Sequence, residues 1–316
     1  MSQIVEADFV VSVDLSDTRL DHVLTELMPE YSRSRLQQWI KQGAITVNGV
    51  QLKAKEKLKV NDLIEIRAEL ESQGAWVAQD IPLDIVYEDD DIIVVNKPVG
   101  LVVHPAAGNH DGTLVNAVLH HFPEIESVPR AGIVHRLDKD TTGVMVVAKT
   151  LIAHAHIVNQ LQERTMGREY EAVVAGVMTG GGKVDEPIAR HSQNRKKMTV
   201  TPFGKHAVTH YRVIERFPAH THIRVKLETG RTHQIRVHMA HIKHGLVGDS
   251  VYGGRQKMPA TASAELKDLL RQFGRQALHA KKLTLIHPKT GEEMSWESEL
   301  PEDILHLLSS LRSDSD

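Results

Sequence analysis

The chain has 316 residues, of which 41% are hydrophobic and 25% charged, and its formal net charge is −3. This balance is typical of a folded protein of about two domains. The absence of cysteine excludes disulfides, a thiolate nucleophile and cysteine-held zinc or iron–sulfur centres. No apolar run approaches the ~20 residues of a membrane span, and the first residues do not resemble a signal peptide, so we expect a cytoplasmic protein with no membrane partner.

The charges are unevenly distributed along the sequence. Acidic residues gather at 88–91 and at the C-terminal end, whereas basic residues gather in the first 60 residues and again at 190–197. Because Lys and Arg drive phosphate binding by releasing counterions, two basic patches on a nearly neutral chain are compatible with selective RNA binding. A solvated charged surface explains them equally well, so charge alone leaves both interpretations open.

The first 70 residues predict a small module of two helices followed by strands. Residues 19–30 and 32–43 have amphipathic patterns, and Ser32 or Ser34 could cap the second helix while Gly43 ends it. Asn48-Gly49 is a two-residue hairpin signal, and residues 62–70 follow as a strand. The apolar faces of the two helices consist of Leu20, Val23, Leu24 and Leu27, and of Leu36, Trp39 and Ile40.

Residues 71–80 have little periodicity and are predicted to be a linker to a second domain, 81–316. Helices and strands are interspersed there without strict alternation, which favours an α+β fold over a doubly wound parallel sheet. Strands are expected at 82–87, 92–98, 100–105, 132–137, 143–150, 168–178, 197–202, 207–217, 222–229 and 281–288. Helices are expected at 113–122, 155–164, 232–242, 264–274 and 302–311.

Three segments carry residues suited to chemistry. The polar loop HRLDKDTTG, 135–143, lies between two expected strands and contains Asp138, although a charged turn would look the same. In ETGRTHQIRVHMAH, Arg231 stands at an expected strand-to-helix junction, where its guanidinium could be directed at a carboxylate. In REYEAVV, Arg168 and Tyr170 share a strand face, and a buried core aromatic is the plainer interpretation of Tyr170.

These three segments and a fourth, KHGLVGDSVYGG at 243–254, resemble the motifs of the pseudouridine synthases that modify ribosomal and transfer RNA. The similarity is greatest to the branch that acts on large-subunit ribosomal RNA, and it spans nearly the whole chain. It implies an S4-like RNA-binding domain at 1–70, of ααβ type. It also implies a catalytic domain at 81–316, built on a mixed, mainly antiparallel sheet with flanking helices.

The resemblance also assigns roles to residues. It implies that Asp138 is the essential carboxylate, that Arg231 pairs with it, that Tyr170 lies against the target base and that Arg136 fills the vacated place in the RNA stack. In the S4-like domain we expect Arg33, Arg35 and Lys41 to contact RNA. Gly245 and Ser250 stand where this branch often has proline, which puts the stiffness of the local loop in doubt but affects none of these residues.

The implied reaction needs no cofactor or metal, because uracil leaves C1′ through N1, turns over and rejoins through C5 without redox change or hydrolysis. One ionised Asp can suffice, either by covalent attack on the sugar or base or by removing a sugar proton, and the sequence does not choose between these. Burial raises the pKa of a carboxylate and a nearby guanidinium lowers it, so an arginine partner is expected.

Other interpretations are weaker. His238, His241 and His244 have a helical spacing, but no HExxH motif supports a metal site. GGGKV at 180–184 lacks the remaining residues of a phosphate loop, and Pro98 directly after Lys97 argues against a kinase lysine.

The main competitor is a non-catalytic RNA-binding or ribosome-assembly protein. A pure binder has no need of a carboxylate that faces phosphates, so the acidic loop favours catalysis.

For the substrate we expect large-subunit ribosomal RNA, first of all the helix 69 stem-loop of 23S ribosomal RNA and otherwise other ribosomal or transfer RNA uridines. We further expect a contribution to ribosome assembly and a monomeric protein.

Overall fold

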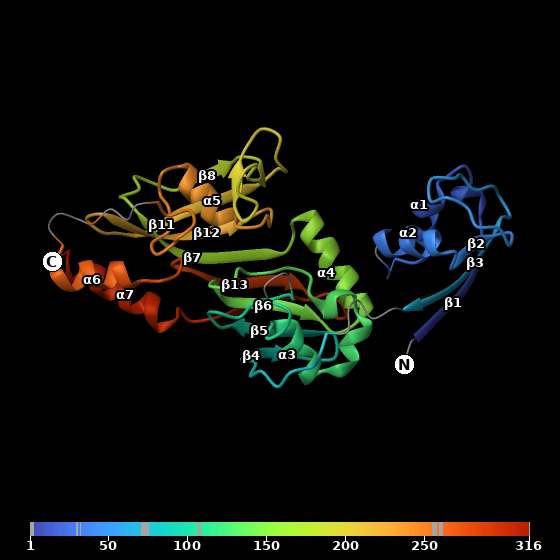
Figure 1. Cartoon of the computed structure of the whole chain (residues 1–316), viewed down its shortest axis with the longest axis horizontal. Helices are drawn as coiled ribbons and strands as arrows, with labels where there is room; N and C mark the ends of the chain where they lie inside the picture. Colours follow the sequence, from blue (N-terminus) through green and yellow to red (C-terminus); the bar gives the residue numbers. More distant parts are fainter. Residues whose placement is uncertain are drawn as a thin grey trace.

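The computed structural model describes residues 3–29, 31, 33–70, 76–105, 109–254, 258 and 262–315, without the side chains of residues 3, 34 and 70. Two parts of the chain form separate hydrophobic cores, one in the first 70 residues and the other built around a nine-stranded sheet. Figure 1 shows the small N-terminal unit beside the large sheet. None of the helices in the described part of the chain is long and apolar enough to span a bilayer.

The N-terminal unit contains a three-stranded antiparallel sheet with strand order β1-β3-β2 and two α-helices. Its elements are β1 (Gln3–Val10), the 3-10 helix η1 (Val13–Leu15), α1 (Leu20–Leu27), α2 (Arg33–Gln42), β2 (Ile45–Val47) and β3 (Leu63–Leu70). The expected apolar faces of both helices are confirmed, since Leu20, Val23, Leu24, Leu36, Trp39 and Ile40 are all buried. Gly43 has a φ of +77° and ends α2 as predicted, whereas Ser32 lies outside the described residues.

The strand β1 was not predicted, so the unit is not of simple ααβ type. Residues 4–10 alternate between exposed and half-buried side chains, a weak signal at the edge of a sheet, and the strand is held by an eight-residue register with β3. The turn at Asn48-Gly49 is confirmed by positive φ at both residues. The hairpin is only one bridge long, between Val47 and Val50, because β2 pairs with the more apolar β3 instead.

The large unit contains sixteen further elements of regular α or β structure and two 3-10 helices among the described residues. The strands are β4 (Ile85–Glu88), β5 (Ile92–Lys97), β6 (Thr142–Ala148), β7 (Gly167–Ala175), β8 (Gly182–Asp185), β9 (Ile188–Arg190), β10 (Met198–Val200), β11 (Val208–Arg216), β12 (His220–Leu227), β13 (Leu278–Ile286) and β14 (Glu293–Glu297). The helices are α3 (Leu114–His121), η2 (Pro123–Ser127), η3 (Pro129–Gly132), α4 (Leu151–Glu163), α5 (Gln234–His241), α6 (Ala264–Gln272) and α7 (Glu302–Ser313). All five predicted helices are present.

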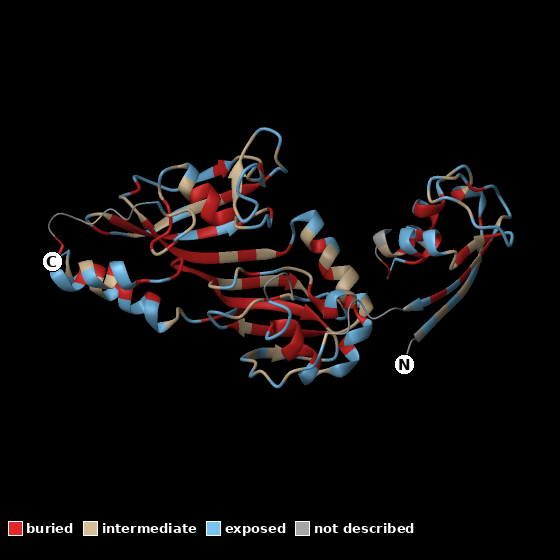
Figure 2. Ribbon diagram, viewed as in Figure 1, coloured by how far each residue is buried: buried red, intermediate tan, exposed pale blue. Residues whose placement is uncertain are grey.

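The nine-stranded sheet has the order β4-β5-β6-β13-β7-β12-β11-β8, with β14 paired to the side of β13. Its pairs are antiparallel except for β13 and β6, so the sheet is mixed and mainly antiparallel, and the α+β class is confirmed. Its central strands are buried along most of their length (Figure 2). The short strands β8, β9 and β14 were not predicted, because their three to five residues give too little alternation.

Two predicted strands are wrong. Residues 100–105 and 132–137 form only isolated bridges, Val102 with Thr113 and Ile133 with Val147. Arg130, Ala131 and Gly132 all have positive φ, which breaks extended structure just before the second segment. His135 Nε2 then accepts the backbone N–H of Val146, a donor that a neighbouring strand would otherwise use. The loop that carries Asp138 therefore follows an irregular segment and leads directly into β6, instead of linking two strands.

The buried side chain of Lys97 holds the backbone of this loop in place. Its side chain is 1% exposed, and Nζ donates to the carbonyl oxygens of Pro98, Leu101 and Lys139 at 2.8, 3.0 and 2.9 Å. Burial lowers the pKa of Lys97 to about 8. The last of the three carbonyls belongs to the residue after Asp138, so a buried side chain at the end of β5 holds the backbone next to that carboxylate.

In the N-terminal unit, a buried carboxylate makes stability depend on pH. Asp21 is fully buried and accepts hydrogen bonds from Arg33 and Gln37, both at 2.7 Å, and from Arg19 at 3.0 Å. Burial alone would raise the pKa of Asp21, but these hydrogen bonds outweigh it and lower the pKa from 3.8 to about 2. Because the folded state lowers this pKa, its stabilising contribution is complete above about pH 4 and is lost as pH falls toward 2.

We therefore expect Asp21→Asn to destabilise the N-terminal unit at pH 6 and to differ much less from the native chain at pH 2.5. The measurement is urea unfolding followed by Trp39 fluorescence, in a chain whose other two tryptophans, Trp76 and Trp296, are replaced by Phe. A difference in unfolding free energy that stays constant from pH 6 to pH 2.5 would contradict the assignment.

Candidate active site

A cavity of about 580 Å³ opens between the loop that contains Asp138, the start of β7 and the turn that leads from β12 into α5. Its lining is strongly cationic, with six arginines against two carboxylates. The arginines are Arg130, Arg136, Arg164, Arg168, Arg231 and Arg236, and the carboxylates are Asp138 and Glu228. Such a surface attracts an anionic polymer even though the whole chain is slightly acidic.

Asp138 is held by Arg236. Arg236 Nη1 donates to Asp138 Oδ2 at 2.9 Å, and its other two nitrogens donate to Asp249 at 2.7 and 2.9 Å. The side chain of Asp249 is fully buried, that of Arg236 is 7% exposed and that of Asp138 is 18% exposed. One guanidinium thus links the loop before β6, helix α5 and the loop after α5.

This arrangement corrects the expectation that Arg231 pairs with Asp138. Arg231 is exposed at the rim of the cavity, and its Nε donates to the carbonyl of His206 at 3.1 Å. The turn at 229–232 points this side chain outward, whereas Arg236 lies on the first turns of α5, where residues 234–239 are all buried. The sequence did contain a signal, because an arginine between Ile235 and Val237 in a buried helix requires an anionic partner.

The charges of this group support one another. Burial alone would lower the pKa of Arg236, but the hydrogen bonds to Asp249 and the charge of Asp138 outweigh it and raise that pKa. Burial likewise acts to raise the pKa of Asp249, and the guanidinium of Arg236 lowers it below its usual value. Arg236 therefore remains cationic, and Asp249 is an ionised carboxylate fixed beneath it.

The second oxygen of Asp138 faces His233 and the cavity. His233 Nε2 lies 3.8 Å from Asp138 Oδ1, and Nδ1 lies 2.7 Å from the hydroxyl of Tyr252. Burial lowers the pKa of His233, which favours a neutral ring. The hydroxyl of Tyr252 also accepts the N–H of Met198, so the hairpin of β9 and β10 is tied to this edge of the site.

Tyr170 and Arg136 both line the same cavity as Asp138. Tyr170 is 7% exposed and belongs to the main hydrophobic core, and burial raises the pKa of its hydroxyl. Arg136, two residues before Asp138, is exposed. The structure therefore brings the four residues Asp138, Tyr170, Arg136 and Arg231 to one cavity, while their roles in the reaction stay a prediction.

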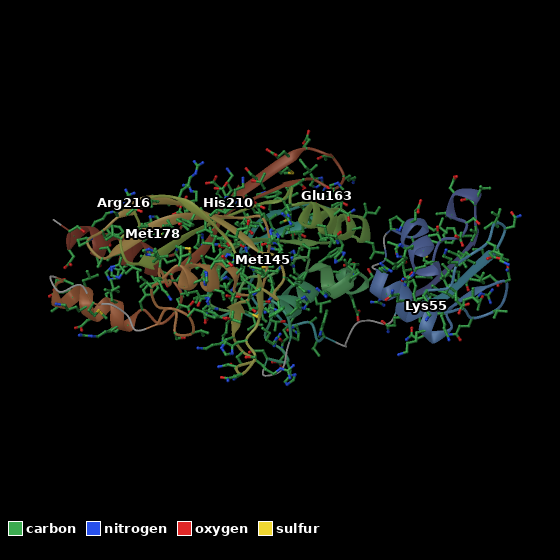
Figure 3. All side chains as sticks on the ribbon, turned by 90° about the horizontal axis from the view of Figure 1, so that it is seen from above. Lys55, Met145, Glu163, Met178, His210 and Arg216 are labelled. Carbon is green, nitrogen blue, oxygen red and sulfur yellow. The ribbon has the colours of Figure 1, made fainter. Side chains whose placement is uncertain are left out.

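The residues expected to contact RNA in the N-terminal unit lie on α2 or directly after it. Arg33 donates to the buried Asp21, which gives it a structural task, although its side chain is 46% exposed. Lys41 is exposed and Arg35 is half-buried. The lysines that follow at 53, 55, 57 and 59 are all exposed and alternate with residues that pack inward, which makes them a single basic edge (Figure 3 labels Lys55).

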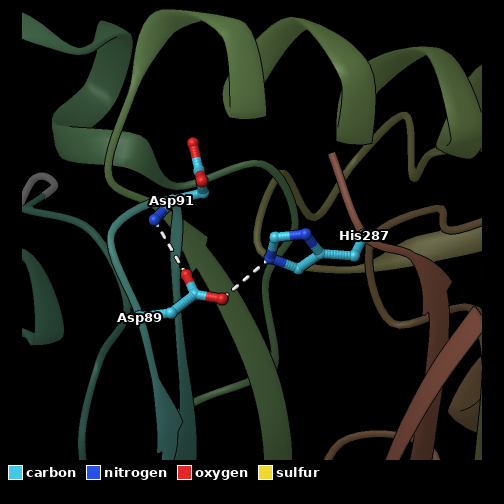
Figure 4. Close-up of side chains that lie close together, drawn as sticks. All are labelled: Asp89, Asp91 and His287. Carbon is cyan, nitrogen blue, oxygen red and sulfur yellow. Dashed lines mark hydrogen bonds and ion pairs between the residues drawn. The ribbon is translucent and has the colours of Figure 1, made fainter. Parts of the chain in front are cut away.

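One group of side chains among the described residues has the composition of a metal site. Asp89, Asp91 and His287 lie close together (Figure 4), but Asp89 already accepts hydrogen bonds from Tyr87, His287 and two backbone N–H groups. Of the three histidines with a helical spacing, His238, His241 and His244, the first already uses both ring nitrogens, toward Thr209 and the carbonyl of Glu186. These hydrogen bonds account for Asp89 and His238 as structural residues.

Comparisons with known proteins identify the family. Residues 91–241 match the model of the RNA pseudouridylate synthase family, and residues 18–64 match the S4 domain. The chain is 60% identical over 99% of its length to ribosomal large subunit pseudouridine synthase D of Pseudomonas aeruginosa, and covers 98% of that protein. It is 56% identical over 99% of its length to the protein of the same name from Escherichia coli, of which it covers 97%.

The solved structure of human RNA pseudouridylate synthase domain containing 4 matches with a TM-score of 0.57 and 26% identity, over 72% of this chain and 92% of that one. The fold and the cavity thus belong to an S4-domain protein with an RNA-modifying isomerase domain. This chain is a member of the RNA pseudouridylate synthase family, and it is an enzyme of that class.

The roles of the two arginines can be separated by their effect on stability. Arg236→Met leaves two carboxylates without their partner, one of them fully buried, and should lower the free energy of unfolding by roughly 3–5 kcal/mol. Arg231→Ala removes an exposed side chain and should change it by less than about 0.5 kcal/mol. Urea unfolding followed by circular dichroism measures both, and equal effects of the two substitutions would contradict the pairing described here.

Proposed function

We propose that this protein isomerises uridines of large-subunit ribosomal RNA to pseudouridine, with Asp138 as the catalytic carboxylate. The observation that carries the proposal is that Asp138 is fixed by a guanidinium in a cavity lined by six arginines. The names of the relatives point to the same substrate, since they are described as ribosomal large subunit enzymes and are matched over nearly their whole length.

Asp138 is suited to act as the one carboxylate that the reaction needs. The hydrogen bond from Arg236 occupies Oδ2, while Oδ1 remains available on the side toward His233 and the cavity. From there it acts on the nucleotide either by covalent attack on the sugar or base or by removing a sugar proton. Asp249 keeps Arg236 in position for this task through two short hydrogen bonds.

The target uridine has to leave its RNA helix to enter the cavity, at a cost of a few kcal/mol of stacking and pairing. Tyr170 offers a ring against which the extruded base can lie, and the exposed Arg136 can occupy the gap in the stack. The buried wall around Tyr170 keeps the detached uracil in place until it rejoins the sugar through C5. Arg231, at the rim beside His206, is suited to contact RNA and not to hold Asp138.

Several finer points belong to the same proposal. We infer that the target lies in the helix 69 stem-loop of 23S ribosomal RNA, with other ribosomal or transfer RNA uridines as the alternative. We also infer that the modification contributes to ribosome assembly, and that the enzyme is a monomer that works in the cytoplasm. The reaction itself calls for no metal or organic cofactor. The proposed domain limits are 1–70 and 81–316, joined by 71–80, and the matched ranges 18–64 and 91–241 fall inside them.

The substrate is tested by mapping pseudouridines in ribosomal RNA from cells with and without this protein. We expect specific large-subunit positions to revert to uridine in the deletion and to be restored by the native chain. A complete and unchanged pseudouridine map in the deletion strain would refute the proposed substrate, and restoration by an inactive variant would indicate an RNA-binding protein without catalytic function.

The catalytic carboxylate is tested by Asp138→Asn. The amide is nearly isosteric, and Arg236 keeps its two bonds to Asp249, so the fold should be retained. We expect isomerisation to be abolished while the affinity for a target stem-loop stays within a few-fold of native. Single-turnover assays and binding titrations measure the two quantities, and turnover at a tenth of the native rate or more would remove Asp138 from its role.

The N-terminal unit is tested through its basic edge. Replacing Lys53, Lys55 and Lys59 by Gln leaves the pair of Lys57 with Asp17 intact and should lower the slope of log affinity against log salt by as much as about 2 to 3, at roughly 0.7–0.9 per phosphate contact. The matched control is Lys282→Gln with Lys289→Gln, since both lysines already face carboxylates. An unchanged slope in the triple variant would mean that this edge does not bind the substrate RNA.

A further inference from the structure

Arg168 is a buried cation that the reaction described above does not use. It lies on β7 two residues before Tyr170, is 7% exposed and lines the cavity that contains Asp138. Strand β7 is paired on both sides, with β12 and β13, so the backbone that carries Arg168 is rigid. The guanidinium is therefore placed by the scaffold at the wall of the site.

Its hydrogen-bonding capacity is mostly unused. The one hydrogen bond it makes to a described residue runs from Nη2 to the carbonyl of Glu228 and is long, at 3.4 Å. Nε is buried and has no partner, and Arg168 forms no ion pair with any residue that the structure describes. Burial accordingly lowers the pKa of Arg168.

Other buried arginines of this chain are treated differently. Arg275, 8% exposed, donates to both oxygens of Asp303 at 2.6 and 2.8 Å, and Arg236 is shared by two carboxylates. Glu228, whose backbone carbonyl accepts the hydrogen bond from Arg168, also has a carboxylate. That carboxylate already has two other partners, His210 at 2.6 Å and Arg164 at 3.4 Å. Burying a cation without a counter-charge costs free energy. The missing counter-charge of Arg168 is therefore best supplied by an anion from outside the chain.

The chain also keeps space for this guanidinium. A Cβ at Gly230 would stand 2.5 Å from Arg168 Nη1, and the backbone of Gly230 is not in the left-handed region. Glycine at 230 is therefore not required by the turn. Its effect is to let the guanidinium approach closely the turn that leads into α5.

We propose that Arg168 binds a backbone phosphate next to the flipped uridine, and so fixes the nucleotide between Tyr170 and Asp138. The proposal rests on the proposed function, since it takes RNA as the ligand. Every nucleotide brings a phosphodiester on each side of its sugar, and the fork of a guanidinium matches phosphate oxygens in geometry and charge. The uracil carbonyls are weaker candidates, because they are uncharged and leave the cation without its counter-charge.

The first test separates binding from structure. Arg168→Met removes a cation without a partner, so the midpoint of urea unfolding should be unchanged or higher, whereas Arg275→Met should lower it because Asp303 is left unpaired. The same Arg168→Met variant should bind a target stem-loop about 10- to 100-fold more weakly, the usual range for loss of a charged hydrogen bond. A lower unfolding midpoint with native RNA affinity would overturn the proposal and make Arg168 a structural residue.

The second test uses RNA with a single neutral linkage. Stem-loops are made with a methylphosphonate on the 5′ or on the 3′ side of the target uridine, and their affinity for the native chain and for Arg168→Met is compared with that of the unmodified RNA. We expect one of the two linkages to weaken binding to the native chain about tenfold or more and to leave binding to the variant unchanged. If both linkages weaken the variant as much as the native chain, Arg168 does not bind phosphate.

Gly230→Ala provides an independent route to the same site, because the added methyl group displaces Arg168 Nη1, the flexible end of a side chain. It should reproduce the loss of sensitivity to the same linkage, and it should add little to Arg168→Met. Full sensitivity in Gly230→Ala would count against the proposal. Native protein that binds the stem-loop but forms no pseudouridine would refute the proposed function instead, so the two failures are distinguishable.

Discussion

The active site depends on one guanidinium placed between two carboxylates. Arg236 reaches Asp138 with one nitrogen and Asp249 with the other two, and all three side chains are buried or nearly so. Because two carboxylates share one guanidinium, this group of three side chains has a negative charge as a whole. That charge is favourable next to the arginines that line the cavity. The fully buried Asp249 fixes the orientation of Arg236, and the more accessible Asp138 remains the member that can reach a substrate.

Much of the fold could be predicted because it follows local patterns. The apolar faces of α1, α2, α6 and α7 are strong periodic signals, and the turn at Asn48-Gly49 requires the residues that occupy it. The edge strand β1 and the segments 100–105 and 132–137 were misjudged for the opposite reason. Their conformation is decided by pairing with distant residues or by side chains such as His135, which takes up a backbone donor of β6.

The cavity was predicted as a set of segments but not as a set of contacts. The loop at Asp138, the strand at Tyr170 and the turn at Arg231 do meet at one cavity. The choice between Arg231 and Arg236 could not be made from spacing, because it depends on how far the chain turns before α5 begins. Burial resolves it, since the arginine inside the helix has to find an anion and the one at the rim already has water and a backbone carbonyl.

The position of β13 bears on how the enzyme comes into being. Strand β6 follows the loop that contains Asp138, and strand β7 carries Tyr170. The two strands are not neighbours in the sheet, because β13 lies between them and pairs with both. Residues 278–286 leave the ribosome more than a hundred residues after these two strands, so the two halves of the cavity cannot be joined during most of synthesis. A nascent chain is attached to a ribosome, which contains the class of RNA that the protein is proposed to modify. Its active site is not assembled until β13 has left the ribosome.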